Sequence, residues 1–194
     1  YAANIGDPAA LGPVVNRIVH KHVSVGIRAE HYPIVGRHLL GAIAETLGDA
    51  ATPELLAAWE EAYTSLASLF IQAEKELYAG ASIEPGQTRP MRVTNVTRES
   101  DDVVSVRMAP EDGGAVPAFR AGQYVSVTIE LEPGYRQTRQ YSLSDAFDGA
   151  TMRISVKRED GAGAAAAGQV SNWIHANVKE GSVLKVSHPF GDFT

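Results

Sequence analysis

The sequence predicts an α plus β protein with two parts, a helical first part and a second part of antiparallel strands. Apolar residues recur at every third or fourth position over residues 1–80, which is the period of amphipathic helices. Beyond residue 90 the period changes to two, as in half-buried strands. The segment between them, residues 81–90, is rich in Gly and Pro and is typical of a linker. We therefore expect a helical domain at 1–80 and a β domain at 91–194.

Three amphipathic helices are expected in the helical part. One face of the first carries Leu11, Val15, Ile18 and His22, and one face of the second carries Tyr32, Val35, Leu39 and Ile43. In the third, Thr52 suits the N-cap and Pro53 the first helical position. Its apolar stripe is made of Leu55, Trp59, Tyr63, Leu66, Phe70 and Leu77.

Several short strands separated by turn signals are expected in the second part, which favours an antiparallel barrel or sandwich. The strand-like runs are Val103–Met108, Val125–Leu131, Arg139–Ser144, Met152–Val156 and Val183–Ser187. One helix should begin near Ser171 and carry Trp173 and Ile174.

The composition excludes several classes of protein. The 194 residues carry a net charge of −6, which argues against a nucleic-acid partner. The absence of cysteine excludes disulfides, thiolate ligation of haem and cysteine-ligated iron–sulfur clusters. No apolar run approaches the ~20 residues of a membrane helix, and no signal peptide opens the chain, so a cytoplasmic protein is expected. Because the chain lacks an initiator Met and stops abruptly after a strand-like run, we expect it to be part of a longer protein.

Three residues of the helical part could meet in one core. His22 lies on the apolar face of the first helix, Tyr32 opens the second, and Glu74 lies at the edge of the apolar stripe of the third. A buried carboxylate is costly unless it is hydrogen-bonded, so these groups could satisfy one another. The pattern alone favours the alternatives, a core histidine with one hydrogen bond and a Glu74 that turns into solvent beside Lys75 and Glu76.

In the β part, the hexamer Arg139–Ser144 is the most informative. The guanidinium of Arg139 can pair with a phosphate, Tyr141 points to the same side and can stack on a flat ring, and Ser142 can bond the ring's polar edge. Gly168 to Ser171 open the expected helix, whose N–H groups suit a pyrophosphate. For an isolated R-x-Y-S, an ordinary strand with a surface arginine remains the simpler interpretation.

The helical segments resemble the proximal side of a flavohaemoglobin's globin domain. The resemblance lies in Ile18-Val19-His20-Lys21-His22, in the run from Tyr32 to Leu40, and in Phe70-Ile71-Gln72-Ala73-Glu74. It implies that His22 is the proximal ligand of haem iron and that Tyr32 and Glu74 are the catalytic pair bonded to its other ring nitrogen. Lys21 matches a family lysine between haem and flavin. The tyrosine that the family keeps on the distal side of the haem has no counterpart here.

Residues 90–194 resemble the flavin domain of the ferredoxin–NADP reductase superfamily. The resemblance implies a partial all-α globin followed by an antiparallel six-stranded Greek-key β-barrel. It also implies which residues hold FAD: Arg139, Gln140, Tyr141 and Ser142 bind it, Tyr124 packs against it, and Gly168, Gln169, Val170 and Ser171 line its pyrophosphate. The loop from Lys157 to Gln169, with the run Ala164 to Ala167, departs from the family as an expansion. No G-x-G-x-x-G module follows, so the nicotinamide-binding domain is expected to be missing.

The function implied is that of a nitric oxide dioxygenase that uses haem b, FAD and NAD(P)H. Electrons would pass from NAD(P)H through FAD to haem, and nitric oxide would be oxidised by O₂ to nitrate. We expect these small-molecule substrates, no nucleic-acid or membrane partner, and a monomer. One alternative is a flavin reductase module fused to a haem-free helical sensing or interaction domain. A weaker one is a structural helical bundle beside an unoccupied barrel.

Overall fold

The structure, a computed structural model, describes residues 8–163 and 165–193. It divides the chain into two compact units, Tyr1–Pro85 and Gly86–Thr194. This division falls within the segment expected as a linker. Both ends of the chain, Ala164 of the expected loop and the side chain of Leu11 lie outside the described part.

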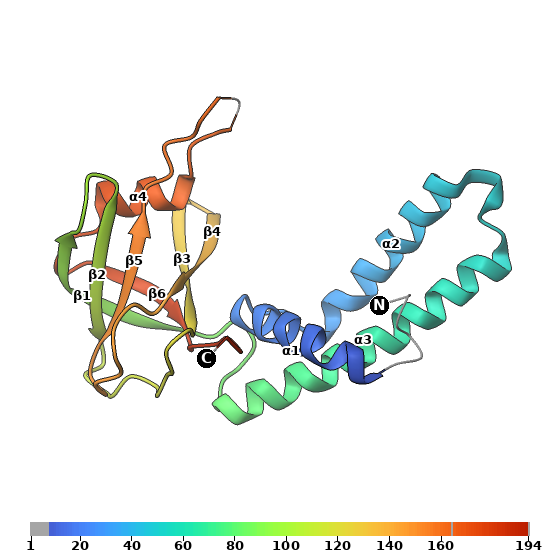
Figure 1. Cartoon of the computed structure of the whole chain (residues 1–194), viewed down its shortest axis with the longest axis horizontal. Helices are drawn as coiled ribbons and strands as arrows, with labels where there is room; N and C mark the ends of the chain where they lie inside the picture. The colour runs from blue at the N-terminus through green and yellow to red at the C-terminus, as the bar shows by residue number, and fades with distance from the viewer. Residues whose placement is uncertain (1–7, 164, 194) are drawn as a thin grey trace. The chain divides into compact units, whose positions relative to one another are not determined.

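The described residues of the helical unit form three α-helices. They are α1 (Pro8–Ser24), α2 (Tyr32–Leu47) and α3 (Pro53–Ala81), and short 3₁₀ turns lie at Ala29–His31 and Gly48–Ala50. Helices α2 and α3 run side by side in opposite directions (Figure 1). The hydroxyl of Thr52 accepts the Leu55 N–H at the start of α3, which confirms the expected N-cap. Within the described residues, no helix combines the length and apolar character needed to cross a membrane.

The buried face of α3 differs in part from the expected stripe. Its buried residues, Ala67, Phe70, Glu74 and Tyr78, follow spacings of three, four and four, so Glu74 lies on the buried face rather than at its edge. Leu55 and Trp59, at the start of the expected stripe, are exposed.

The second unit is a six-stranded antiparallel sheet, which confirms the expected fold class. Its strands are β1 (Thr88–Arg98), β2 (Val103–Pro110), β3 (Tyr124–Glu132), β4 (Tyr135–Ser142), β5 (Met152–Lys157) and β6 (Val183–Ser187). The spatial order β4-β3-β6-β1-β2-β5 inserts the last strand between β1 and β3, as in a Greek key. A bridge between Leu143 and Ile154 joins the two edges of the sheet.

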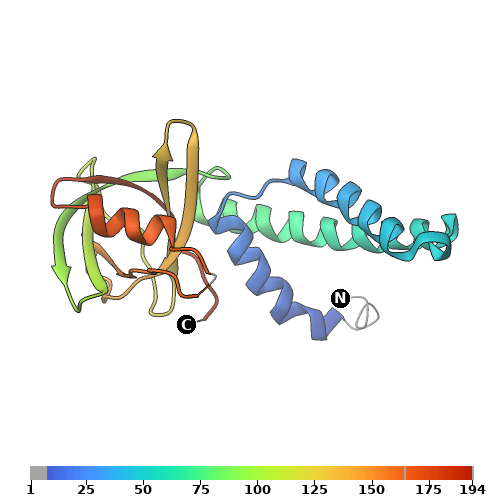
Figure 2. The same cartoon turned by 90° about the horizontal axis from the view of Figure 1, so that it is seen from above.

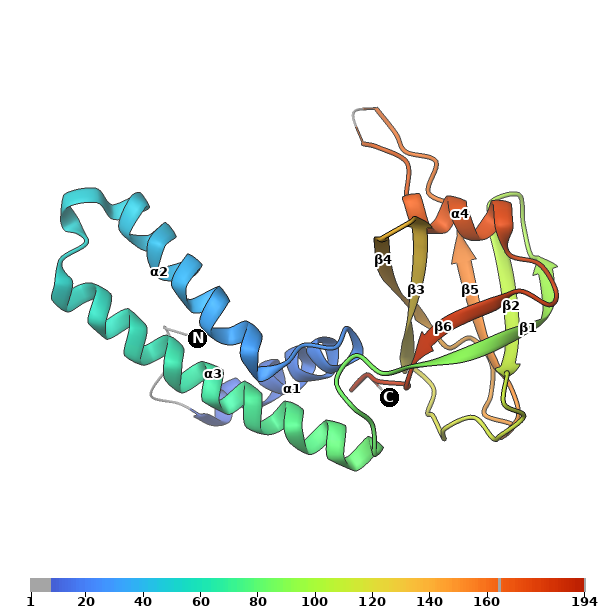
Figure 3. The same cartoon turned by 180° about the vertical axis from the view of Figure 1, so that it is seen from behind.

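Helix α4 (Gln169–Asn177) lies across one end of this barrel (Figures 2 and 3). Its buried residues Val170 and Ile174 join the barrel core, in which the side chains of Val106, Val125, Val127 and Ile154 are fully buried. The helix begins two residues before the expected position because Gly168 serves as its N-cap.

Strand β1 was not expected from the sequence. Met91 and Val93 point into the core, but a bulge between Val93 and Asn95 shifts the pairing with β2 by one residue. An extra residue moves every later side chain to the other face, so the period of two breaks in the middle of the strand. Pro90 also lies within β1, in the stretch whose composition resembles a linker.

Candidate functional site

The structure brings His22, Tyr32 and Glu74 together from three different helices. Nδ1 of His22 lies 2.7 Å from Glu74 Oε1, and the Tyr32 hydroxyl donates to the same oxygen at 2.5 Å. The His22 Nδ1 and Tyr32 hydroxyl are 3.1 Å apart. The Glu74 side chain is only 3% exposed. The sequence pattern alone favoured a solvated Glu74, and that interpretation is wrong, because the carboxylate is buried against two polar partners.

Tyr32 acts as a hydrogen-bond donor in this group. Burial raises the pKa of its phenol far above the usual value, and the bond to Glu74 and the charge of that carboxylate raise it further. The phenol therefore stays protonated near neutral pH and donates to Glu74. Since a carboxylate oxygen accepts, the hydrogen bond to Glu74 is donated by Nδ1 of His22, and Nε2 takes no part in it.

Two further tyrosines hold the backbone around this group. The Tyr63 hydroxyl donates to the carbonyl oxygen of Tyr32 at 2.7 Å, and its ring lies over Gly36 so closely that a Cβ there would be 2.6 Å away. The Tyr78 hydroxyl donates to the carbonyl of Ile27 at 2.8 Å, on the loop that follows α1. Sequence reasoning missed Tyr78, although its spacing of four from Glu74 on α3 was a usable signal.

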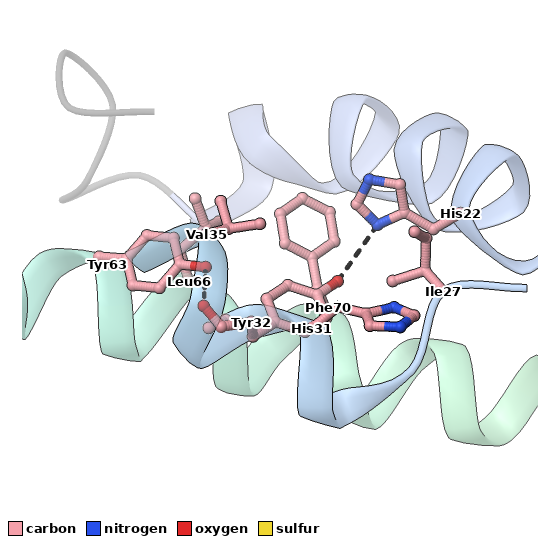
Figure 4. Close-up of a pocket in the computed structure, with 9 residues that line it drawn as sticks. His22, Ile27, His31, Tyr32, Val35, Tyr63, Leu66 and Phe70 are labelled. Carbon is pink, nitrogen blue, oxygen red and sulfur yellow. Dashed lines mark hydrogen bonds between the residues drawn. The ribbon is translucent and has the colours of Figure 1, made fainter. Parts of the chain in front are cut away.

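An apolar pocket of about 240 Å³ opens beside His22. Figure 4 shows its lining, which includes Ile27, Val35, Leu66 and Phe70. The imidazole of His22 is 31% exposed, and because Nδ1 is turned toward buried Glu74, the edge that carries Nε2 is the accessible one. His31 also lines the pocket, and its Nδ1 accepts the Arg28 N–H. An apolar wall with the imidazole of His22 beside it fits the proximal side of a haem. Lys21, the neighbouring residue in α1, is exposed.

In the barrel, the residues expected to hold flavin lie on both faces of β4. Arg139 and Tyr141 are two residues apart and share one face, while Gln140 and Ser142 share the other. Tyr124 is the cross-strand partner of Ser142 and therefore lies on that second face. Burial raises the pKa of the Tyr141 phenol, whose ring packs against the barrel core.

A line of hydrogen bonds connects Arg139 with the first turn of α4. Arg139 donates to Gln137 Oε1 at 2.9 Å, and Gln137 donates to the Tyr135 hydroxyl at 2.9 Å. That hydroxyl donates in turn to Gln169 Oε1 at 3.2 Å. All four side chains are polar, and three of them lie on one face of β4. The structure thus brings the arginine strand and the helix N-terminus to one place.

The first turn of α4 presents backbone N–H groups. The first intrahelical bond runs from Asn172 N–H to Gly168 O at 3.1 Å, so the N–H groups of residues 169–171 precede it. Gly168 has no room for a side chain, because a Cβ would lie 2.7 Å from Ser171 Oγ and 3.0 Å from Glu159 Cβ. The Ser171 hydroxyl donates to Gly168 O and accepts from Glu159 N–H, and the Val170 side chain is in the core. The backbone, rather than these side chains, is therefore available to an anion.

Tyr124 is held where β3 begins. Its N–H donates to Phe190 O at 2.8 Å, and Phe190 N–H donates back to Tyr124 O at 2.9 Å. A Cβ at Gly191 would lie 3.2 Å from the Tyr124 ring, so the glycine allows the ring to lie against the Gly191 backbone. Phe190 and Gly191 thus support one wall of the expected flavin site.

Comparisons with known proteins agree with both units. The Globin family matches residues 1–70, and the Oxidoreductase FAD-binding domain family matches residues 90–194. The chain is 53% identical to a flavohemoprotein of Chromobacterium violaceum, over 100% of this chain and 49% of that protein. It is 43% identical to a flavohemoprotein of Bacillus subtilis, over 99% and 47%. The chain thus spans about half the length of the curated relatives it matches.

Solved structures show the same likeness. A flavohemoglobin from Malassezia yamatoensis, determined with bound FAD and heme, superposes with a TM-score of 0.76 at 32% identity, over 94% of this chain and 45% of that one. The FAD/NAD binding domain of a nitric oxide dioxygenase from Vibrio cholerae superposes with a TM-score of 0.51 at 43% identity, over 55% and 45%. By its two matched domains and by these relatives, the chain belongs to the flavohaemoprotein family, of which it carries part of the globin and the FAD-binding domain.

Proposed function

We propose that this chain is the central part of a longer, cytoplasmic flavohaemoprotein that oxidises nitric oxide to nitrate with O₂ and NAD(P)H. The observation that carries the proposal is the buried group of His22, Tyr32 and Glu74, which directs one imidazole nitrogen toward an apolar pocket. This group lies in the same chain as an FAD-binding domain. The likeness to a nitric oxide dioxygenase from Vibrio cholerae supports the choice of reaction.

Within this proposal, His22 would hold the iron of haem b through Nε2. Glu74 accepts the Nδ1 proton, which makes the imidazole a stronger electron donor, and Tyr32 holds the carboxylate in place by its own bond. Haem and FAD supply the one-electron chemistry that links hydride from NAD(P)H to the reduction of O₂. Strong donation from an axial ligand favours the activation of O₂ over its simple storage.

The barrel residues hold FAD in the proposed protein. Arg139 and the N–H groups of residues 169–171 bind the pyrophosphate, because they combine a fixed positive charge with a helix N-terminus. Tyr141 and Tyr124 give flat surfaces to the flavin, and Ser142 and Gln140 bond its polar groups. Lys21 supplies a positive charge beside the haem ligand. Because the relatives are about twice as long, we place the nicotinamide-binding domain outside these residues.

Absorption spectra of the full-length protein test this proposal against its alternatives. We expect a Soret band together with the two visible bands of FAD, and loss of the Soret band on His22→Ala. A yellow protein with no Soret band after addition of haemin would instead establish the flavin reductase with a haem-free helical domain. A protein that binds neither cofactor would leave only a structural role for both units.

A further inference from the structure

The barrel closes at the residues that directly follow the expected flavin strand. Strands β4 and β5 are the two edges of the sheet, and neither pairs with the other along its length. They meet only just beyond Ser142, where Leu143 and Ile154 form a bridge and Ser144 N–H donates to Arg153 O at 2.9 Å. We call this junction of residues 143–144 with 153–154 the seam.

Arg153 holds Ser144 with its side chain as well as with its backbone. Its guanidinium donates through Nη2 to the Ser144 carbonyl oxygen and through Nε to the Ser144 hydroxyl, the latter at 3.2 Å. The Ser144 hydroxyl also accepts from Ser155 Oγ at 3.0 Å, and Ser155 Oγ lies 3.0 Å from Ser105 Oγ. One arginine and a row of hydroxyls thus hold a single residue at the seam.

An ion pair fixes the next residue along the chain. Arg107 of β2 bonds the carboxylate of Asp145 and also donates to Thr151 Oγ1 at 3.1 Å. The bond from Arg107 holds the pKa of Asp145 below its usual value, so this carboxylate is charged at neutral pH. Arg153 Nε also lies 4.0 Å from the same carboxylate. Ser144 and Asp145 are therefore held from the β2–β5 side of the barrel.

On this geometry, we propose that Arg153 is a positioning residue for the flavin ring. Ser142 is the last residue of β4, and the seam begins one residue later. The direction of the backbone at Ser142, and with it the place of its hydroxyl, depends on where residues 143 and 144 are held. The planar fork of arginine reaches the carbonyl and the hydroxyl of Ser144 together, which the point charge of lysine does not do. The inference rests on the proposed role of Ser142 in binding FAD.

The substitution Arg153→Lys tests this role, with Arg92→Lys as its control. Arg92 also lies on a strand of the same sheet and bonds one carbonyl, Gly181 O at 3.1 Å, and one carboxylate, Glu111 at 2.5 Å. We expect Arg153→Lys to weaken FAD binding about tenfold, which is about 1.4 kcal/mol. We also expect it to change the visible circular dichroism of the bound flavin at saturation. Arg92→Lys should leave both within about twofold of wild type.

The outcomes separate the inference from the proposed function. Wild-type protein that binds no FAD would overturn both. Wild-type affinity and an unchanged flavin spectrum in Arg153→Lys, with only a lower melting temperature, would overturn the positioning role alone. If Arg153→Lys fails to fold, Ser144→Ala removes the shared hydroxyl without changing charge. Its flavin spectrum should change in the same direction, and an unchanged one would overturn the inference.

Discussion

The two candidate sites of this chain are built in opposite ways. In the helical unit, three side chains from three helices meet at the buried carboxylate of Glu74, and Tyr32 and Glu74 lie 42 residues apart in the sequence. In the barrel, four consecutive residues of β4, the neighbouring Tyr124 of β3 and the first turn of one helix supply the groups. The first site depends on packing across the whole unit, and the second depends mainly on local backbone. The effects of substitutions at the three helical side chains should therefore be non-additive, whereas the effects of substitutions in the barrel should add.

The largest effect is expected for His22→Ala. It removes the imidazole that lines the apolar pocket and whose Nδ1 is engaged by Glu74. We expect the full-length protein to lose its stoichiometric Soret band when titrated with haemin. His38→Ala, an exposed histidine of α2, serves as the control and should keep the band. Equal haem binding by both variants would contradict the assignment of the axial ligand.

In the barrel, Arg139→Ala should weaken FAD binding by about 1.5–3 kcal/mol, the size of a lost charged hydrogen bond. Arg136→Ala is a matched control, because Arg136 lies on the other face of β4 and pairs with exposed Glu130 at 3.3 Å. Titration of the apoprotein with FAD measures both. An unchanged dissociation constant for Arg139→Ala would refute its role, and an equal loss in the two variants would indicate a general effect of charge.

Two glycines of α2 test how closely the helical site is packed. An added Cβ at Gly36 would lie 2.6 Å from the Tyr63 ring, whose hydroxyl is tied to Tyr32 O, whereas Gly41 faces open space. We expect Gly36→Ala to lower the free energy of unfolding by about 1–3 kcal/mol. Gly41→Ala should raise it by about 0.5–1 kcal/mol, the usual gain of alanine over glycine in a helix. Urea denaturation measures both, and changes of the same sign would show that the Tyr63 ring moves freely.

The contrast between the sites explains what the sequence could predict. The R-x-Y-S strand, the last strand Val183–Ser187 and the helix start near Ser171 are local patterns. The last strand was found at its predicted bounds and the helix begins two residues early, whereas β4 begins at Tyr135, four residues before the predicted start at Arg139. The division of roles between the two faces of β4 follows from simple alternation. The sequence did not indicate that the Val170 side chain is buried in the barrel core or that the Ser171 hydroxyl bonds Gly168 O. These contacts leave the backbone N–H groups of the first turn to bind an anion.

Long-range contacts explain what the sequence could not predict. The burial of Glu74 depends on hydrogen-bond partners that belong to α1 and α2. Its neighbours on α3, Lys75 and Glu76, are charged, so the local sequence predicted an exposed Glu74 side chain. The seam at Ser144 and Arg153 forms only when the two edges of the sheet close, and nothing in either strand indicates it. Strand β1 was hidden by its own bulge, which interrupts the alternation on which sequence-based assignment depends.

The smallest and most specific effect is expected for Glu74→Gln in the haem-loaded full-length protein. The amide oxygen of glutamine can still accept the Nδ1 proton of His22 and the Tyr32 hydroxyl, so the imidazole should stay in place and haem should remain bound. The negative charge is lost, so His22 becomes a weaker donor and the oxidised iron is stabilised less. We expect the iron reduction potential to rise by about 60 mV, about 1.4 kcal/mol for one electron, and turnover to fall.

The control is Glu76→Gln, which removes a charge two residues away. The Glu76 side chain is exposed and bonded to Gln72 at 2.7 Å, so its loss should leave the potential unchanged. Spectroelectrochemistry of the three proteins decides the matter: coincident midpoint potentials would mean that the buried carboxylate only holds the helices together, and equal shifts in both variants would mean that any nearby charge has the same effect.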